Sequence, residues 1–213
     1  MKKCIIIAAG EFYEEKIKKD KDDLLIVADA GYDNFLKLKN LSLDDIDIII
    51  GDFDSYQLSD MKISQKTRVI ELNPIKNDSD TFDAIVEGMN LGYKEFYLYG
   101  VLGKRIEHTL GNLYCLAYLK DLGCNGYIIE KNKVLRVISN ETVEFSKKYK
   151  GYISIYPLGG TCEHVNVSGF KYELKDFELS YMQSTLGLDN EFDGKKASIS
   201  VGKGMLLVIY CIK

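Results

Sequence analysis

Hydrophobic and polar positions change their period along this chain, and the change divides it into two parts. Up to about residue 130, short apolar runs alternate with helical patterns. The apolar runs expected to form strands are residues 3–8, 24–28, 46–50, 68–72, 95–99 and 127–130. Alternation of strands and helices over such a length predicts a mostly parallel sheet covered by helices.

Two helices are predicted between these strands. Apolar residues recur at the spacing of one helix face in segments 82–89 and 110–117. The first segment is preceded by Asp78, Ser79 and Asp80, which are residue types that cap the free N–H groups at a helix start.

The second part of the chain has a different pattern. Short, mostly alternating runs are separated by Gly, Asn, Asp and Lys turns, at residues 134–138, 141–145, 152–156, 163–167, 180–184, 197–201 and 205–212. This pattern predicts an antiparallel sandwich or barrel. We therefore expect an α/β domain over residues 1–128 and an antiparallel domain over residues 129–213.

Composition narrows the class of protein. The net charge is −4 and the lysines are scattered, so no basic stripe indicates a nucleic-acid partner. No apolar run approaches the ~20 residues of a membrane span. The five cysteines are odd in number and form no CxxC pair, which favours reduced thiols in a cytoplasmic protein.

Acidic residues follow several of the predicted strands. Asp52 and Asp54 come directly after the third strand, and Gly51 ends that strand. Two such charges about 4 Å apart repel by roughly 4 kcal/mol near a protein surface, so the pair is expected to hold a cation. Mg²⁺ is the natural candidate because it prefers oxygen ligands and bridges phosphates.

Two more aspartates are candidates for the same site. Asp29 ends the second strand and Asp80 follows the fourth. Because ligands bind outside the carboxyl ends of parallel strands, we expect these side chains to converge with Asp52. Taken singly, Asp29 has an alternative role as a turn former and Asp80 as a helix cap.

A glycine-containing segment, residues 100–108, follows the fifth strand and precedes a helix. Gly103 would allow the backbone to approach a phosphate, and Arg105 would hold phosphate oxygens through two parallel hydrogen bonds. The segment is neither a Walker loop nor a dinucleotide-binding fingerprint. A solvated Lys104, with Glu107 and His108 acting only as helix caps, is the alternative.

Together these segments resemble the thiamine pyrophosphokinase family, in order along nearly the whole chain. Residues 51–55, Gly-Asp-Phe-Asp-Ser, match that family's most specific motif outright. Residues 27–31 resemble its Ala-Asp-Gly-Gly/Ala segment, residues 76–80 its Lys-Asp-x-Thr-Asp, and residues 103–108 its Gly-Gly-Arg-x-Asp-His, which continues as Leu-x-Asn. Further similar segments are residues 156–159, 169–172, 184–192 and 201–204.

The resemblance implies a C-terminal β-sandwich and a homodimer with active sites between subunits. The reaction it implies is transfer of diphosphate from ATP to the thiamine hydroxyl, giving thiamine diphosphate and AMP. Mg²⁺ and the triphosphate would be bound by Asp52, Asp54 and Asp80, with Asp29 organising the pocket. The ATP phosphates would be bound by Lys76, Gly103, Arg105, His108 and Asn112. The thiamine would be bound by Ser184 and Asn190.

Four positions depart from the family pattern. Lys104 stands in place of a glycine, Glu107 and Asn77 in place of aspartates, and Asp189 in place of a serine. The chain has no Trp, so stacking on thiamine would need Tyr or Phe. Two other functions stay open at this point: a diphosphokinase acting on another alcohol such as a pterin, and a non-catalytic nucleotide- or metal-binding protein.

Overall fold

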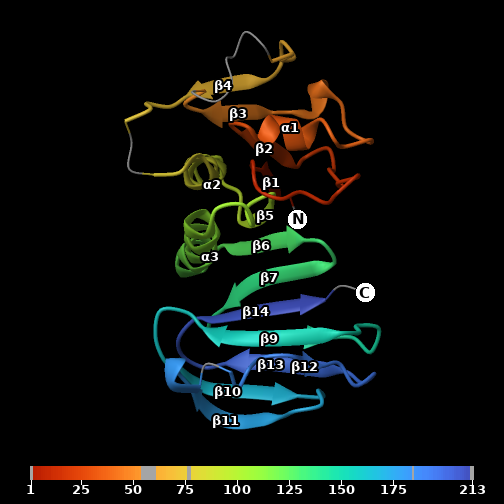
Figure 1. Cartoon of the computed structure of the whole chain (residues 1–213), viewed down its shortest axis with the longest axis vertical. Coiled ribbons are helices and arrows are strands. Elements are labelled where there is room, and N and C mark those ends of the chain that lie inside the picture. Colours follow the sequence, from red (N-terminus) through yellow and green to blue (C-terminus); the bar gives the residue numbers. More distant parts are fainter. Residues whose placement is uncertain (1, 54–60, 76–77, 184, 212–213) are drawn as a thin grey trace. The chain divides into compact units, whose positions relative to one another are not determined.

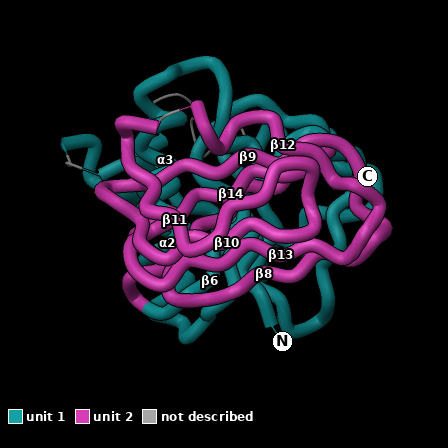
Figure 2. The backbone as a smooth tube through the Cα atoms, turned by 90° about the horizontal axis from the view of Figure 1, so that it is seen from below, with its two compact units in different colours: residues 1–115, 123–131 teal, residues 116–122, 132–213 magenta. Residues whose placement is uncertain are grey.

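The computed structural model describes residues 2–53, 61–75, 78–183 and 185–211. It divides into two compact units (Figure 2). Unit 1 contains residues 1–115 and 123–131, and unit 2 contains residues 116–122 and 132–213. Among the described residues, no helix is long and apolar enough to cross a bilayer.

Unit 1 is an α/β unit whose sheet is parallel throughout its described pairs. Its strands are β1 (Cys4–Ile7), β2 (Leu24–Ala28), β3 (Ile48–Gly51), β4 (Arg68–Glu71), β5 (Glu95–Tyr99) and β6 (Asn125–Glu130). Its helices are α1 (Gly31–Phe35), α2 (Asp80–Asn90) and α3 (Ile106–Asp121), with a short 3₁₀ turn, η1 (Leu43–Asp45). The helix α3 continues from unit 1 into unit 2.

The order of the strands in unit 1 determines where a ligand can bind. The order is β6-β5-β1-β2-β3-β4, and Figure 1 shows it from β6, coloured green, to β4, coloured yellow. The chain runs outward from β1 to β4 and then returns to place β5 on the other side of β1. The point where the strand order reverses is therefore between β1 and β5, and ligands of open α/β sheets bind at such a point.

Burial explains why these strands form in the interior of the sheet. Every residue of β1 and β2 is buried, as expected for strands covered on both faces. One part of the core packs Ile5, Leu25 and Ile49 from adjacent strands against Tyr32 and Phe35 of α1. The parallel sheet predicted for the N-terminal part is confirmed.

Unit 2 consists of two antiparallel sheets. One has the order β12-β9-β14-β7 and the other is a four-stranded sheet with the order β11-β10-β13-β8. The strands are β7 (Lys133–Ile138), β8 (Glu141–Phe145), β9 (Tyr152–Pro157), β10 (Cys162–Ser168), β11 (Leu174–Leu179), β12 (Asn190–Glu191), β13 (Ala197–Val201) and β14 (Leu206–Cys211). One core contains Ile155 and Val208 from the first sheet and Val165 and Ile199 from the second. The antiparallel sandwich is therefore confirmed.

The strand predicted at residues 180–184 is wrong. Residues Tyr181–Gln183 form a 3₁₀ helix, η3, and the strand lies earlier, in β11. The physical reason is local, because both the N–H and the hydroxyl of Ser180 donate to the Gln183 side chain, at 3.0 and 2.9 Å. Such side-chain bonds compete with strand pairing. The edge strand β11 was missed because half of its residues are exposed, so its apolar alternation is weak.

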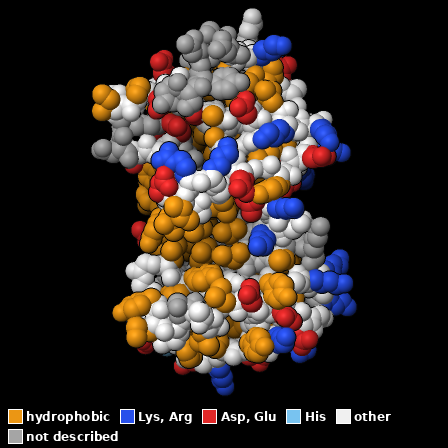
Figure 3. Space-filling view, viewed as in Figure 1, with side chains coloured by type: hydrophobic (Ala, Val, Ile, Leu, Met, Phe, Trp, Pro, Cys, Tyr) orange, Lys and Arg blue, Asp and Glu red, His pale blue; other side chains and the backbone are white. Residues whose placement is uncertain are grey.

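The charged surface agrees with the scattered lysines of the sequence. On the face drawn in Figure 3, the lysine and arginine side chains of the described residues are interspersed with acidic ones. The five cysteines are free thiols, and four of them are buried.

Candidate active site

A cavity of about 500 Å³ opens in unit 1 at the carboxyl ends of the strands. Its lining comes from the segments that follow β1, β2, β3, β4 and β5, and from the N-terminal parts of α2 and α3. It therefore lies where the strand order reverses, and its size is typical of a small-molecule site. The predicted site residues that line it are Asp29, Asp52, Asp80, Gly103, Arg105, His108 and Asn112.

The acidic wall of the cavity is assembled by two neighbouring strand ends. Asp29 follows β2 and Asp52 follows β3, and the Asp29 N–H donates to the Ile50 carbonyl at 2.8 Å. A β-carbon added at Gly51 would lie 2.9 Å from the Asp29 β-carbon. Glycine is therefore required at residue 51 so that Asp29 can lie close to the third strand's end.

The backbone is left-handed at Asp29 and at Phe53, the residue after Asp52. Asp29 has a φ of 43° and Phe53 has a φ of 54°, in the left-handed region that aspartate tolerates better than a bulky residue does. Phe53 is buried, at 9% exposure, in the same core as Tyr32. The aromatic between the two motif aspartates thus anchors the turn, while Asp52 lines the cavity.

Asp80 reaches the cavity from the next element of the wall. It is the first residue of α2, and Ser79 is the N-cap, whose hydroxyl accepts from the Phe82 N–H at 3.3 Å. Ser79 performs the capping, and Asp80 lines the cavity together with Asp78. The alternative of Asp80 as the cap is therefore not what the structure shows.

The basic wall comes from the loop between β5 and α3. This loop is bonded to the loop after β1: the Gly10 N–H donates to Gly100 O at 2.6 Å, and the Glu11 N–H donates to Leu102 O at 2.8 Å. Gly103 has a φ of 78°, and a β-carbon there would lie 2.5 Å from the Glu11 side chain. The Gly103 N–H donates to Thr109 Oγ1 at 3.2 Å. Gly103 is thus needed for packing against Glu11.

Arg105 and Glu107 form an exposed pair at the start of α3. The Arg105 Nε donates to the Glu107 carboxylate at 2.6 Å. The pKa of Glu107 is lowered, first by a hydrogen bond from its own backbone N–H and then by Arg105. This contact uses the Nε edge of Arg105, and a guanidinium carries further N–H donors on its two Nη atoms.

Among the described residues, Asn112 is the most buried of those predicted to bind phosphate, at 6% exposure. Its Nδ2 donates to the Val101 carbonyl at 2.6 Å. Asn112 therefore holds the loop between β5 and α3 against the helix. Sequence reasoning did not foresee this role.

Asn190 is the one remaining predicted residue among those described, and it does not line this cavity. Asn190 belongs to unit 2, where its side chain bonds twice to the backbone of Tyr172: Nδ2 donates to Tyr172 O at 2.7 Å, and Oδ1 accepts from the Tyr172 N–H at 3.0 Å. Asp54, Lys76 and Ser184 lie outside the described residues.

Sequence reasoning missed the loop after β1. Ala8, Ala9 and Gly10 line the cavity, and the signal was an Ala-Ala-Gly segment directly after a fully buried strand. The buried Asn34 supports this loop, because its Nδ2 donates to Ala8 O at 2.7 Å and to Gly10 O at 3.0 Å. No local pattern indicated that role.

A protein-only metal cage is absent from the described part of the chain. Within residues 2–53, 61–75, 78–183 and 185–211, no three His, Cys, Asp or Glu side chains are grouped to hold one ion. Asp29, Asp52, Asp78 and Asp80 nevertheless line the same cavity.

Comparisons with known proteins agree over both parts of the chain. The family model for the thiamin pyrophosphokinase catalytic domain matches residues 16–128, and the one for the vitamin B1 binding domain of the same family matches residues 135–206. A thiamine pyrophosphokinase of Bacillus subtilis is 24% identical over 162 residues, which is 75% of each chain.

Solved structures show the same fold. A thiamine pyrophosphokinase structure from Bacillus subtilis superposes with a TM-score of 0.82 at 24% identity and covers 98% of both chains. A thiamin pyrophosphokinase family protein from Enterococcus faecalis gives a TM-score of 0.81 at 23% identity over 99% of both chains. The thiamin pyrophosphokinase of Candida albicans gives 0.76 at 16% identity, over 98% of this chain and 88% of that one.

Proposed function

The chain belongs to the thiamin pyrophosphokinase family and is a thiamine diphosphokinase, and we propose that its reaction takes place in the cavity of unit 1. It transfers diphosphate from ATP to the hydroxyl of thiamine, giving thiamine diphosphate and AMP. The observation that supports this location is the meeting of an acidic wall and a basic wall at the point where the strand order reverses.

The acidic wall supports a role for Mg²⁺. Its carboxylates offer the hard oxygen donors that this ion prefers, and Mg²⁺ is usually held by one or two carboxylates plus substrate phosphates and water. We propose that Asp52 and Asp80 hold the ion with Asp54, and that Asp29 organises the wall. When bound, the ion would neutralise phosphate charge.

The basic wall supports phosphate binding by Arg105. Diphosphate transfer needs positioning and charge neutralisation more than covalent help from the protein. With its Nε on Glu107, Arg105 has its Nη atoms available for two parallel bonds to phosphate oxygens. Lys76 and His108 are proposed to bind the same phosphates. A carboxylate of the acidic wall is proposed to accept the proton of the attacking thiamine hydroxyl.

The thiamine end is proposed to involve unit 2. Ser184 and Asn190 are assigned there by resemblance to the family, in a homodimer whose sites lie between subunits. The bonds from Asn190 to the Tyr172 backbone support a positioning role for this residue. The free thiols support a cytoplasmic location.

Product identity tests the proposed reaction. The purified protein is incubated with ATP, Mg²⁺ and thiamine, and nucleotides and thiamine esters are separated. We expect AMP and thiamine diphosphate in equal amounts. Formation of ADP with thiamine monophosphate would instead indicate transfer of the γ-phosphate. Turnover with a pterin alcohol but not with thiamine would identify a sister enzyme, and ATP binding without any product would identify a non-catalytic protein.

A further inference from the structure

We propose that Lys104 is a further phosphate-binding cation of this cavity, held in place by the Ala9 carbonyl. The inference rests on the proposed function of the cavity as a nucleotide site. In this proposal, Lys104 binds the phosphates of ATP in addition to Arg105.

The backbone at Lys104 is in a conformation that lysine rarely adopts. Its φ is 55°, in the left-handed region, where the β-carbon of an L-residue crowds the backbone. Glycine occupies such positions without this cost, as Gly103 does immediately before it, at a φ of 78°. A lysine at this position therefore costs stability relative to glycine.

The Lys104 side chain makes a defined contact in the cavity lining. Its Nζ donates to the Ala9 carbonyl at 2.6 Å, which joins the loop before α3 to the loop after β1. Lys104 and Ala9 both line the cavity. An ammonium group has three donors, so two remain after the bond to Ala9. Because this bond already restricts the Lys104 side chain, the side chain loses less conformational entropy when a ligand binds.

The charge of the cavity lining explains why a further cation would help to bind a nucleotide here. The cavity is lined by Asp29, Asp52, Asp78 and Asp80, whose carboxylates repel a triphosphate. The Arg105 Nε already forms an ion pair with the Glu107 carboxylate at 2.6 Å. Among the described residues, no ion pair involves the Lys104 ammonium. Lys104 therefore brings a cation, held by a neutral carbonyl, into the cavity that these carboxylates line.

Binding of a nucleotide that cannot react separates this role from catalysis. We would measure the affinity for Mg²⁺ and α,β-methylene-ATP by calorimetry, and thermal unfolding, for the wild type and for Lys104→Gly, Lys104→Met and Lys104→Arg. We expect Lys104→Gly to unfold at the same or a higher temperature, because the left-handed strain is removed. Its affinity, and that of Lys104→Met, should fall by about tenfold or more, as for loss of a charge-assisted bond. Lys104→Arg should stay within about threefold of the wild type.

The control is Lys66→Met, which removes an exposed positive charge of unit 1 that does not line the cavity. It should bind the nucleotide as the wild type does. Wild-type affinity in Lys104→Gly and Lys104→Met would overturn the proposal and leave only a structural tether. Failure of the proposed reaction would be seen separately, because the wild type would then form no AMP. Even in that case, the nucleotide affinities of the wild type and the Lys104 variants would still test the role of Lys104.

Discussion

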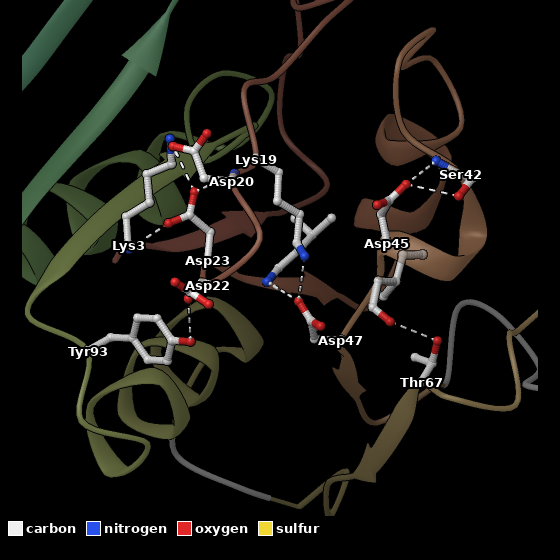
Figure 4. A network of polar contacts seen from close by, with 12 residues as sticks. Lys3, Lys19, Asp20, Asp22, Asp23, Ser42, Asp45, Asp47, Thr67 and Tyr93 are labelled. Atoms are coloured by element: carbon white, nitrogen blue, oxygen red, sulfur yellow. Dashed lines mark hydrogen bonds and ion pairs between the residues drawn. The ribbon is translucent and has the colours of Figure 1, made fainter. Parts of the chain in front are cut away.

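The Asp47 carboxylate accepts a hydrogen bond of 2.8 Å from the backbone N–H of Leu25, and the Asp47 N–H donates to the Leu25 carbonyl at 3.1 Å. This reciprocal pair immediately precedes the first paired residues of β2 and β3, Ile26 and Ile48. Lys19 approaches the same carboxylate at 3.2 Å (Figure 4). The pair lies at the amino ends of the strands, whereas the cavity lies at their carboxyl ends.

Replacing Asp47 by Ala should lower stability without a direct effect on catalysis. The completely buried Leu25 would lose the acceptor for its N–H, which costs about 1–3 kcal/mol in the free energy of unfolding. Urea unfolding measures the change. Asp47→Asn keeps a side-chain oxygen as acceptor and should lose less. An Asp47→Ala protein as stable as the wild type would contradict this role.

Replacing Asp52 by Asn should abolish turnover and leave the fold intact, because the amide removes a charge proposed to hold the cation. We expect kcat to fall on the order of a hundredfold or more, with unchanged circular dichroism. The control is Asp83→Asn, a half-buried residue on the first turn of α2 that does not line the cavity. If Asp52→Asn keeps more than about a tenth of the activity, the assignment as a metal ligand fails.

Gly103→Ala should displace the loop between β5 and α3. The new β-carbon would combine left-handed strain with a clash against Glu11, so the loss of stability should exceed the ~1–2 kcal/mol of strain alone. Gly159→Ala is a matched control, since Gly159 has a φ of 83° but no atom within 4 Å of the added carbon. Thermal unfolding and the KM for ATP are measured for both.

The clash with Glu11 is tested by a second substitution. Glu11→Ala combined with Gly103→Ala should restore part of the lost stability and of the lost ATP affinity. If both glycine variants lose the same stability, packing against Glu11 is not the reason for glycine at residue 103.

Asn190→Ala should loosen the segment that carries Tyr172. Loss of the two bonds to the Tyr172 backbone should cost about 1 kcal/mol of stability, and the KM for thiamine should rise if this segment positions the substrate. Tyr172→Phe is the control, because both bonds involve only the backbone of Tyr172. An unchanged KM for thiamine in Asn190→Ala would remove this residue from the proposed thiamine site.

The His164–Asp176 pair should make the stability of unit 2 depend on pH. Nδ1 of His164 lies 2.6 Å from the Asp176 carboxylate, and the pKa of His164 is raised, first by this hydrogen bond and then by the charge of Asp176. A raised pKa in the folded state stabilises the protein below the ordinary histidine pKa of about 6.5. That stabilisation is lost as the pH rises through the higher, folded-state pKa of His164.

Asp176→Asn tests this pair. The pKa of His164, measured by NMR titration, should fall, and the wild type should unfold at a higher temperature than Asp176→Asn at about pH 5.5 but not at about pH 9. In a His164→Asn background, Asp176→Asn should no longer change the pH dependence. An equal difference in unfolding temperature at both pH values would argue against the pair as its source.

The sequence by itself determined the strands of the parallel sheet and the acidic ends of two of them. Strands 24–28 and 95–99 begin and end where the pattern predicts, because the periodicity of apolar residues follows from burial, which is a local property of the sequence. The carboxyl ends of parallel strands meet at one edge, so Asp29 and Asp52 had to converge once the sheet was assumed.

Only the tertiary structure decided how the polar groups are used. Asn112 bonds to Val101, Gly103 packs against Glu11, and Lys104 reaches Ala9, so segments as many as 95 residues apart define the basic wall. A local pattern indicates that a polar residue is near a site, but not which donor or acceptor the fold will place opposite it. Residue types along one segment therefore predict the edge of the sheet where the chemistry occurs, and packing between distant segments decides which side chains remain available for it.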